Sequence, residues 1–413
     1  MVIGRREVLF AAVTVPAAGL APASTAGAEA AAVVATGRRV VTGADVLAAD
    51  HWRGLEGRVA VLGNPTAVLR DGVHVVDSMV AAGVPPVVVL GPEHGFRGTA
   101  QAGGSEGDHA DPRTGIKVRD VYRADAAKFA GVLREERVDV LVFDIADVGA
   151  RFYTYIWTML TAMTAAASVG ARFVVLDRPN PLGGKAKGPQ LLPGFASGVG
   201  VKPVVQQHGL TVGELAGLFA GEFLDTPLDL DVVEVRHWRR DDLDTGLAWV
   251  PPSPNMPTRD TALVYPGTCL FEGTSFTEGR GTTKPFETVG SPDVDWRWAE
   301  DLNGERLPGV RFRETYFAPA FGRYAGRTCG GVQLQVTNAR EFDAVRTGVA
   351  MIVTAARRYP FAWREDNWVD LLFGSDRLRR MVDARAGIDD IVGSWRQELD
   401  EFDRTRKPYS RYR

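Results

Sequence analysis

Four apolar runs in the first half of the chain each end at a polar residue capable of chemistry. They are VAVLG before Asn64, VVVLGP before Glu93 and His94, VLVF before Asp144 and Asp147, and FVVL before Asp177 and Arg178. Apolar runs alternate with amphipathic stretches from about residue 57 to 236, which predicts a parallel sheet with right-handed crossovers and helices on both faces. Ligands of such sheets bind outside the carboxyl ends of the strands, so we expect one shared site there.

The pattern predicts an α/β N-terminal domain over residues 38–248. Its strands are expected near 58–63, 86–91, 138–144, 172–177 and 228–235, and its helices near 74–83, 124–136, 152–169 and 211–223. Thr211 and Glu214 have the spacing of a capping box at the start of the last helix.

The proline-rich segment 249–258 predicts a rigid connection to a smaller α+β domain over 249–413. We expect a strand at 331–336 and helices near 341–358 and toward 384–402. The Gly/Thr-rich loop 265–287 is long enough to suggest a functional role.

Composition limits the classes of function. The 48 basic and 51 acidic residues give a net charge of −3 without a long run of like charge, so nothing indicates nucleic acid or an anionic membrane as partner. The first strand is followed by NPTAV rather than a Gly-rich phosphate loop. No H-E-x-x-H zinc helix occurs, and no G-x-S-x-G sequence directly joins a predicted strand to a helix, as a nucleophile elbow requires. A small neutral or weakly charged substrate fits best.

Residues 1–30 have the layout of an export signal, with Arg5 and Arg6 before an apolar stretch and then the small-residue segment ASTAGAEA. The paired arginines suggest the twin-arginine route. An uncut membrane anchor is the alternative, although the apolar stretch is shorter than the ~20 residues of a span. In an exported protein Cys269 and Cys329 either pair or remain two buried thiols.

Glu93 is the strongest single candidate for catalysis. A carboxyl group at the end of a buried strand is partly removed from water, which favours the protonated form that a general acid needs. A Glu that merely caps the following turn is the structural alternative. Likewise Asp147 and Arg151 fit an ion-pair network, and Glu272, Glu278 and Arg280 fit a solvated loop.

The chain resembles the NamZ-type exo-β-N-acetylmuramidase family over nearly its whole mature length. The segments that carry the resemblance are GNPTAV, GPEHGFRG, FDIADVGARFYTYIWTM, VLDRPNPLGG, HGLTVGELA, WVPPSPNMPT, YPGTCLFEGTSFTEGRGTTKPFE and RKPYSRY. The resemblance implies a Rossmann-like N-terminal half, a cleft between the halves, and exo-hydrolysis of β-1,4-linked N-acetylmuramic acid (MurNAc) from peptidoglycan fragments. It implies no nucleotide, metal or other cofactor. Ala146 replaces the glutamine usual in the family's third motif.

Glycoside hydrolysis usually needs two carboxyl groups. We expect Glu93 to be the general acid, and its partner to be Glu278, Asp144 or Glu272, unless the 2-acetamido group of the sugar is the nucleophile. Arg280, and after it Arg151, is expected to bind the 3-O-lactyl carboxylate of MurNAc. The predicted substrate-binding residues are Asn64, His94, Arg151, Tyr155, Asp177, Arg178, Asn180, Asn255, Glu272 and Arg280.

Two other hypotheses remain. One is a metal-dependent hydrolase in which Asp144, Asp147, Asp177 and His94 hold Mg²⁺ or Mn²⁺. The other is a non-catalytic protein that binds cell-wall glycan.

Overall fold

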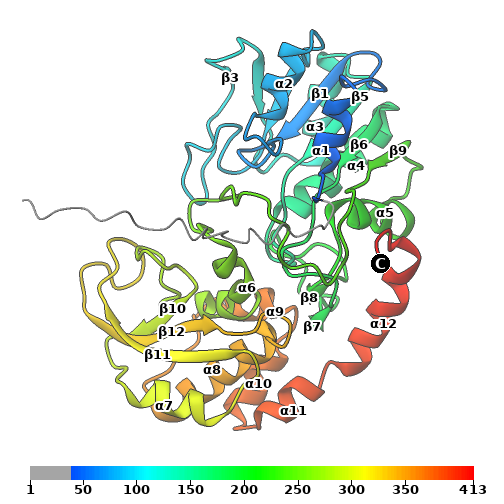
Figure 1. Cartoon of the computed structure of the whole chain (residues 1–413). Helices are drawn as coiled ribbons and strands as arrows, with labels where there is room; N and C mark the ends of the chain where they lie inside the picture. Colours follow the sequence, from blue (N-terminus) through cyan, green and yellow to red (C-terminus); the bar gives the residue numbers. More distant parts are fainter. Residues whose placement is uncertain (1–38) are drawn as a thin grey trace, which may run out of the picture. The chain divides into compact units, whose positions relative to one another are not determined.

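A seven-stranded sheet forms the centre of the N-terminal half (Figure 1). The structure is a computed structural model that describes residues 39–413, which form one compact unit. The strand order is β3 (His109–Ala110), β4 (Lys117–Asp120), β2 (Val88–Gly91), β1 (Val59–Gly63), β5 (Val140–Asp144), β6 (Arg172–Leu176) and β9 (Leu230–Val233). Every pairing is parallel except that of β3 with β4. The strand order reverses between β1 and β5, and a ligand crevice is expected at that point.

Both faces of this sheet are covered, which explains strands without polar alternation. The helices of this half are α1 (Gly43–Ala49), α2 (Val75–Ala81), α3 (Ala126–Glu135), α4 (Tyr155–Val169) and α5 (Val212–Glu222). Leu62 and Phe143 belong to the core shared with α3, α4 and α5, whereas Val61 and Val142 belong to a separate core with α1 and α2. The predicted α/β class is confirmed, and the predicted elements of this half end within three residues of the observed ones.

The C-terminal half is a smaller α+β arrangement. Its sheet has the antiparallel order β10 (Thr288–Ser291), β12 (Cys329–Val336) and β11 (Val310–Phe317). Its helices are α6 (Arg259–Thr268), η1 (Cys269–Gly273), α7 (Arg297–Gly304), α8 (Ala344–Arg358), α9 (Trp368–Phe373), α10 (Arg377–Asp383), α11 (Ile388–Gly393), α12 (Arg396–Arg406) and η2 (Lys407–Tyr409). A small ribbon of β7 (Lys187–Gln190) and β8 (Val205–Gln207) contacts α12. The boundary expected at residue 249 remains a prediction.

Helix α6 was not predicted, because Pro266 lies inside it. The helix starts at the capping hydroxyl of Thr258 and packs closely against α8. At the crossing, a Cβ atom on Gly267 would lie 1.9 Å from the carbonyl oxygen of Ala344, so only glycine fits there. This close packing fixes the part of the chain that leads into η1.

The predicted export signal lies outside the described residues. Within residues 39–413 no helix is both long and apolar enough to cross a membrane. Cys269 and Cys329 are both buried and free, so the structure shows the second of the two alternatives for these thiols.

Candidate active site

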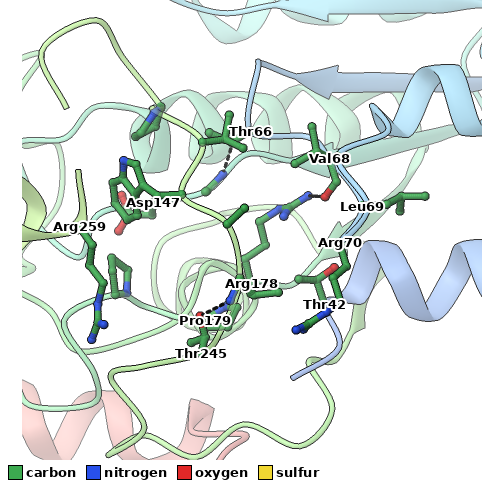
Figure 2. A pocket seen from close by; sticks show the side chains of 18 of the residues that line it. Thr42, Thr66, Val68, Leu69, Arg70, Asp147, Arg178, Pro179, Thr245 and Arg259 are labelled. Atoms are coloured by element: carbon green, nitrogen blue, oxygen red, sulfur yellow. Dashed lines mark hydrogen bonds between the residues drawn. The ribbon is translucent and has the colours of Figure 1, made fainter. Parts of the chain in front are cut away.

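The sequence led us to expect that the strand ends converge on one site. The structure shows that they do not. The end of β2 opens into a cleft with the C-terminal half, whereas the ends of β1, β5 and β6 open into a separate pocket (Figure 2). The cleft has a volume of about 150 Å³ and is lined by Glu93, His94, Ala102, Phe152, Tyr153, Thr154, Tyr155, Val199, Ser253, Asn255, Met256, Tyr265, Cys269, Glu272, Arg280, Phe286 and Leu372. Five predicted substrate-binding residues, His94, Tyr155, Asn255, Glu272 and Arg280, therefore share the cleft with Glu93.

Glu93 is half-buried, and two neighbours orient its carboxyl group. The backbone N–H of Gly103 donates to Oε1 at 2.9 Å, and the hydroxyl of Thr154 donates to Oε2 at 3.4 Å. Oε1 is therefore fixed as an acceptor, because a backbone amide can only donate. A proton on this carboxyl group is then carried by Oε2.

His94 has a backbone conformation that is rare outside glycine, with φ at 69°. Its Nδ1 lies 3.0 Å from the carbonyl oxygen of Ala100 and must carry a hydrogen, because a carbonyl can only accept. In the neutral ring, Nε2 is therefore an acceptor. Strained backbone that is held in place beside a cleft is typical of functional sites.

One arginine of the cleft bonds two carboxylates. Nη1 of Arg280 lies 2.7 Å from Oε1 of Glu272 and 2.8 Å from Oε1 of Glu278. Burial alone would lower the pKa of Arg280, but the two carboxylates outweigh burial and raise that pKa further above its usual value. Glu272 lines the cleft, whereas Glu278 does not and is 8% exposed. The three groups together carry a net charge of −1.

Aromatic side chains form much of the cleft wall. Tyr265 packs edge-on against Phe152, Tyr153 and Phe286. The hydroxyl of Tyr155 lies 2.9 Å from the carbonyl oxygen of Pro252, and burial raises the pKa of Tyr155 above its usual value. A neutral, apolar wall of this kind suits the face of a sugar ring and not a highly charged ligand.

Three predicted residues are separated from the cleft by burial and by their own partners. Asp144 is fully buried in an ion pair with Arg178, whose Nη2 also donates to the carbonyl oxygen of Val68. Burial raises the pKa of Asp144, and Arg178 opposes that shift. Asp177 is fully buried and accepts from Thr211, from Tyr412 and from the backbone of Gly213. Asp144 and Asp177 do not line the cleft, and Arg178 lines the second pocket instead.

The expected role of Arg151 in binding the lactyl group is wrong. Its guanidinium is fully buried and donates to the carbonyl oxygens of Pro189, Val204 and Leu372. Those bonds leave it no path to a ligand, and they join the β7–β8 ribbon to α9.

Two predicted asparagines hold loops and do not line the cleft. Asn180 donates to the carbonyl oxygen of Leu210 and accepts from the backbone of Leu182. Asn64 is fully buried, and its Oδ1 accepts from both the backbone and the hydroxyl of Thr66. Each amide shapes the loop that follows a strand, so its effect on the site is indirect.

The oxygen donors of the metal hypothesis have separate partners. Asp144 pairs with Arg178, Asp147 with His208, and Asp177 with Tyr412. In the part of the chain described, no group of three or more His, Cys, Asp or Glu side chains is arranged to hold a metal ion. The residues proposed for Mg²⁺ or Mn²⁺ therefore do not fit one site.

Sequence reasoning missed Thr154, Ser253 and Tyr265, which line the cleft. Thr154 and Ser253 lie beside predicted site residues within two of the quoted motifs, so proximity was an available signal. Tyr265 lies in the helix whose internal proline concealed it, and its position facing Phe152 has no signature in the sequence.

An apolar-walled cleft at the carboxyl end of a parallel sheet, with acids from both halves and without a nucleotide loop, defines an α/β protein of the glycoside hydrolase type. Sequence models of the N-terminal and C-terminal domains of exo-β-N-acetylmuramidase NamZ match residues 59–260 and 263–412. The chain belongs to the NamZ family.

A curated relative and two crystal structures agree with this assignment. The peptidoglycan β-N-acetylmuramidase NamZ of Bacillus subtilis (strain 168) is 44% identical over 382 residues, which are 91% of this chain and 92% of the relative. Two DUF1343 family proteins of Bacteroides fragilis superpose with TM-scores of 0.81 and 0.74 at 31% and 28% identity. Each comparison covers 91% of this chain and 99% of the solved one.

Proposed function

We propose that this protein is an exo-acting glycoside hydrolase that releases MurNAc from the non-reducing end of peptidoglycan fragments. The observation that supports this most directly is that Glu93, from the end of β2, and Glu272, from η1, line the same cleft. Glycosidases usually place two carboxyl groups on either side of the bond that breaks, where an oxocarbenium-like transition state develops.

Glu93 acts as the general acid in this proposal. Its Oε1 is held by the N–H of Gly103, so Oε2 delivers the proton to the glycosidic oxygen as the bond to the sugar breaks. The hydroxyl of Thr154 keeps Oε2 oriented before the substrate arrives.

Glu272 is the second carboxylate that the structure favours. Asp144 is paired with Arg178, and neither Asp144 nor Glu278 lines the cleft. Nη1 of Arg280 holds Oε1 of Glu272 in position. The carboxylate there would activate water, attack the anomeric carbon, or stabilise a 2-acetamido group that attacks in its place. The configuration of the released sugar distinguishes inversion from the two retaining routes.

Specificity for MurNAc requires a cation for the lactyl carboxylate. Arg280 and, when protonated, His94 are the basic side chains that line the cleft. Because Arg280 is already bonded to two glutamates, it offers its remaining N–H groups and not a free charge. His94 is therefore a second contributor to this recognition.

The direct test is hydrolysis of a chromogenic β-MurNAc glycoside, with the β-N-acetylglucosamine (GlcNAc) glycoside as control and each reaction repeated with EDTA. We expect cleavage of the MurNAc glycoside to exceed that of the control at least tenfold and to be unchanged by EDTA. Equal rates on both glycosides would contradict MurNAc specificity. Loss of activity with EDTA would support the hypothesis of a metal-dependent hydrolase.

Export is part of the proposal, because peptidoglycan lies outside the cytoplasm. The paired arginines, the apolar stretch and the Ala-x-Ala sites of the first thirty residues support it. We expect the mature chain to begin between about residues 27 and 32. Intact-mass measurement on protein from its own host checks this, and a soluble cytoplasmic form that retains Met1 would contradict it.

A further inference from the structure

A second pocket lies at the point where the strand order of the large sheet reverses (Figure 2). Thr66 follows β1, Ala146 and Asp147 follow β5, and Arg178 follows β6. The pocket has a volume of about 220 Å³ and is closed by the segment that contains Trp249. Crevices at this position are where open α/β sheets bind ligands, yet the proposed hydrolysis uses the cleft at the end of β2 instead.

Two buried polar atoms in this pocket lack partners. Oδ2 of Asp147 accepts from the backbone N–H of Gly149 at 2.6 Å and from Nε2 of His208 at 3.0 Å. Nε2 carries the hydrogen, since Nδ1 of His208 accepts from the backbone of Leu210. Oδ1 of Asp147 has no hydrogen-bond partner among the described residues, and the same is true of Nε of Arg259.

An unsatisfied buried acceptor and an unsatisfied buried donor are costly unless a ligand completes them. Asp147 is 9% exposed, and Figure 2 shows it on the same side of the pocket as Arg259. The two atoms do not bond to each other, so a ligand that offers both a donor and an acceptor would satisfy both.

The remaining lining defines the class of ligand. Three arginines line the pocket, and Arg178 is already paired with Asp144. The charges of Arg70 and Arg259 remain against the single lining acid Asp147, so a carboxylate is favoured. The apolar wall includes Trp249, whose indole N–H donates to the carbonyl oxygen of Met256 and so fixes the ring. A held indole ring next to a hydroxyl acceptor suits a sugar ring.

We propose that this pocket is a second binding site, separate from the hydrolytic cleft, for a hydroxylated carboxylate of the sugar-acid class. In this arrangement Asp147 accepts from a ring hydroxyl, Arg259 binds the carboxylate, and Trp249 covers one face of the ring. MurNAc is the sugar acid that the proposed reaction releases, so naming it as the occupant rests on the proposed function. The class of ligand, a hydroxylated carboxylate, does not rest on the proposed function.

The two sites share a thin wall. Pro252 lines the second pocket, and its carbonyl oxygen accepts from Tyr155, which lines the cleft. Ser253 and Asn255, the next lining residues along the chain, face the cleft. Released MurNAc held in the second pocket therefore lies against the same proline segment that shapes the hydrolytic site.

Calorimetric titration of the whole chain with MurNAc tests the proposal without using hydrolysis as a readout. Arg259→Gln removes the charge and the unpartnered donor, and we expect it to weaken this binding at least tenfold. Ala146→Leu places a larger side chain at the pocket wall and should weaken binding similarly. Arg134→Gln, at an exposed position of α3, removes the same charge far from the pocket and should leave binding unchanged.

GlcNAc lacks the carboxylate and D-lactate lacks the ring, so both should bind at least tenfold more weakly than MurNAc. MurNAc binding that is equal in the wild type, Arg259→Gln and Ala146→Leu would overturn the second site. So would GlcNAc binding as strong as that of MurNAc. A chain that binds MurNAc through Arg259 but hydrolyses no MurNAc glycoside would retain the second site and refute the proposed function alone.

Discussion

Oε1 of Glu272 lies 2.7 Å from Nη1 of Arg280 at the edge of the cleft. Glu278 bonds the same nitrogen, so one guanidinium holds two carboxylates. The guanidinium therefore acts first to hold Glu272 in place, and its binding of the lactyl group is secondary.

We therefore expect Arg280→Ala to lower kcat/KM on both MurNAc and GlcNAc glycosides. The loss of transition-state stabilisation should be about 2–3 kcal/mol, the scale of a lost charge-assisted hydrogen bond. The sequence alone had suggested a loss confined to the MurNAc glycoside. Arg280→Lys keeps the charge and should recover part of the rate on both substrates. A loss confined to MurNAc would show that Arg280 reads the lactyl group.

The buried pair of Asp144 and Arg178 should affect stability and not chemistry. Asp144→Asn leaves the guanidinium of Arg178 buried without a counter-charge, which typically costs about 3–5 kcal/mol. Urea unfolding should show that loss, while kcat of the folded fraction stays within a factor of about two to three, since Asp144 does not touch the cleft. A stable variant with no activity would show instead that Asp144 takes part in catalysis.

The pH dependence of stability should reflect Asp177. Burial raises the pKa of Asp177 to about 6, against the donors Tyr412, Gly213 and Thr211, from an ordinary value of 3.8. The folded state binds the proton more tightly than the unfolded state, so this group's contribution is complete below pH 3.8 and is lost as pH rises to about 6.

We expect the free energy of unfolding of Asp177→Asn, measured in urea between pH 4 and pH 7, to fall less with rising pH than that of the wild type. Tyr412→Phe removes a hydroxyl that donates to the ionised carboxylate, so it should move the wild-type window to higher pH. Parallel pH profiles for the wild type and Asp177→Asn would show that Asp177 titrates alike in both states.

The sequence predicted the parallel sheet well, because apolar runs of this length without polar alternation fit little other than buried strands. It missed β3 and β4 at one edge of the large sheet, the short buried strand β10, and β11, whose exposed face carries ordinary polar residues. It also missed α6, because a proline inside a helix is normally a signal against one.

The sequence predicted only in part which of the candidate residues lie together in one site. Glu93, His94, Tyr155, Asn255, Glu272 and Arg280 do lie together. Asp144, Asp177 and Arg151 follow the same rule of polar residues at or just beyond strand ends, yet each is buried with its own partner. Whether such a residue faces a ligand or a neighbouring loop depends on tertiary contacts, such as Tyr412 reaching Asp177, that no local pattern contains.

In the proposed reaction, Glu93 donates the proton that breaks the glycosidic bond. Glu93→Gln keeps the size of the side chain and the bond from Gly103, but removes the transferable proton on Oε2. We predict that kcat on a MurNAc–GlcNAc disaccharide, whose leaving group needs protonation, falls by about 10²–10⁴. Cleavage of a nitrophenyl glycoside, which needs much less protonation, should fall far less.

The comparison of these two substrates in the same folded variant is therefore the most direct measurement, with circular dichroism and the wild-type pH profile as references. We predict a large loss on the disaccharide, a small loss on the nitrophenyl glycoside, and a pH profile that no longer declines from acidic to basic pH. Equal losses on both substrates, with the fold intact, would contradict this prediction and show that Glu93 positions the sugar while another group supplies the proton.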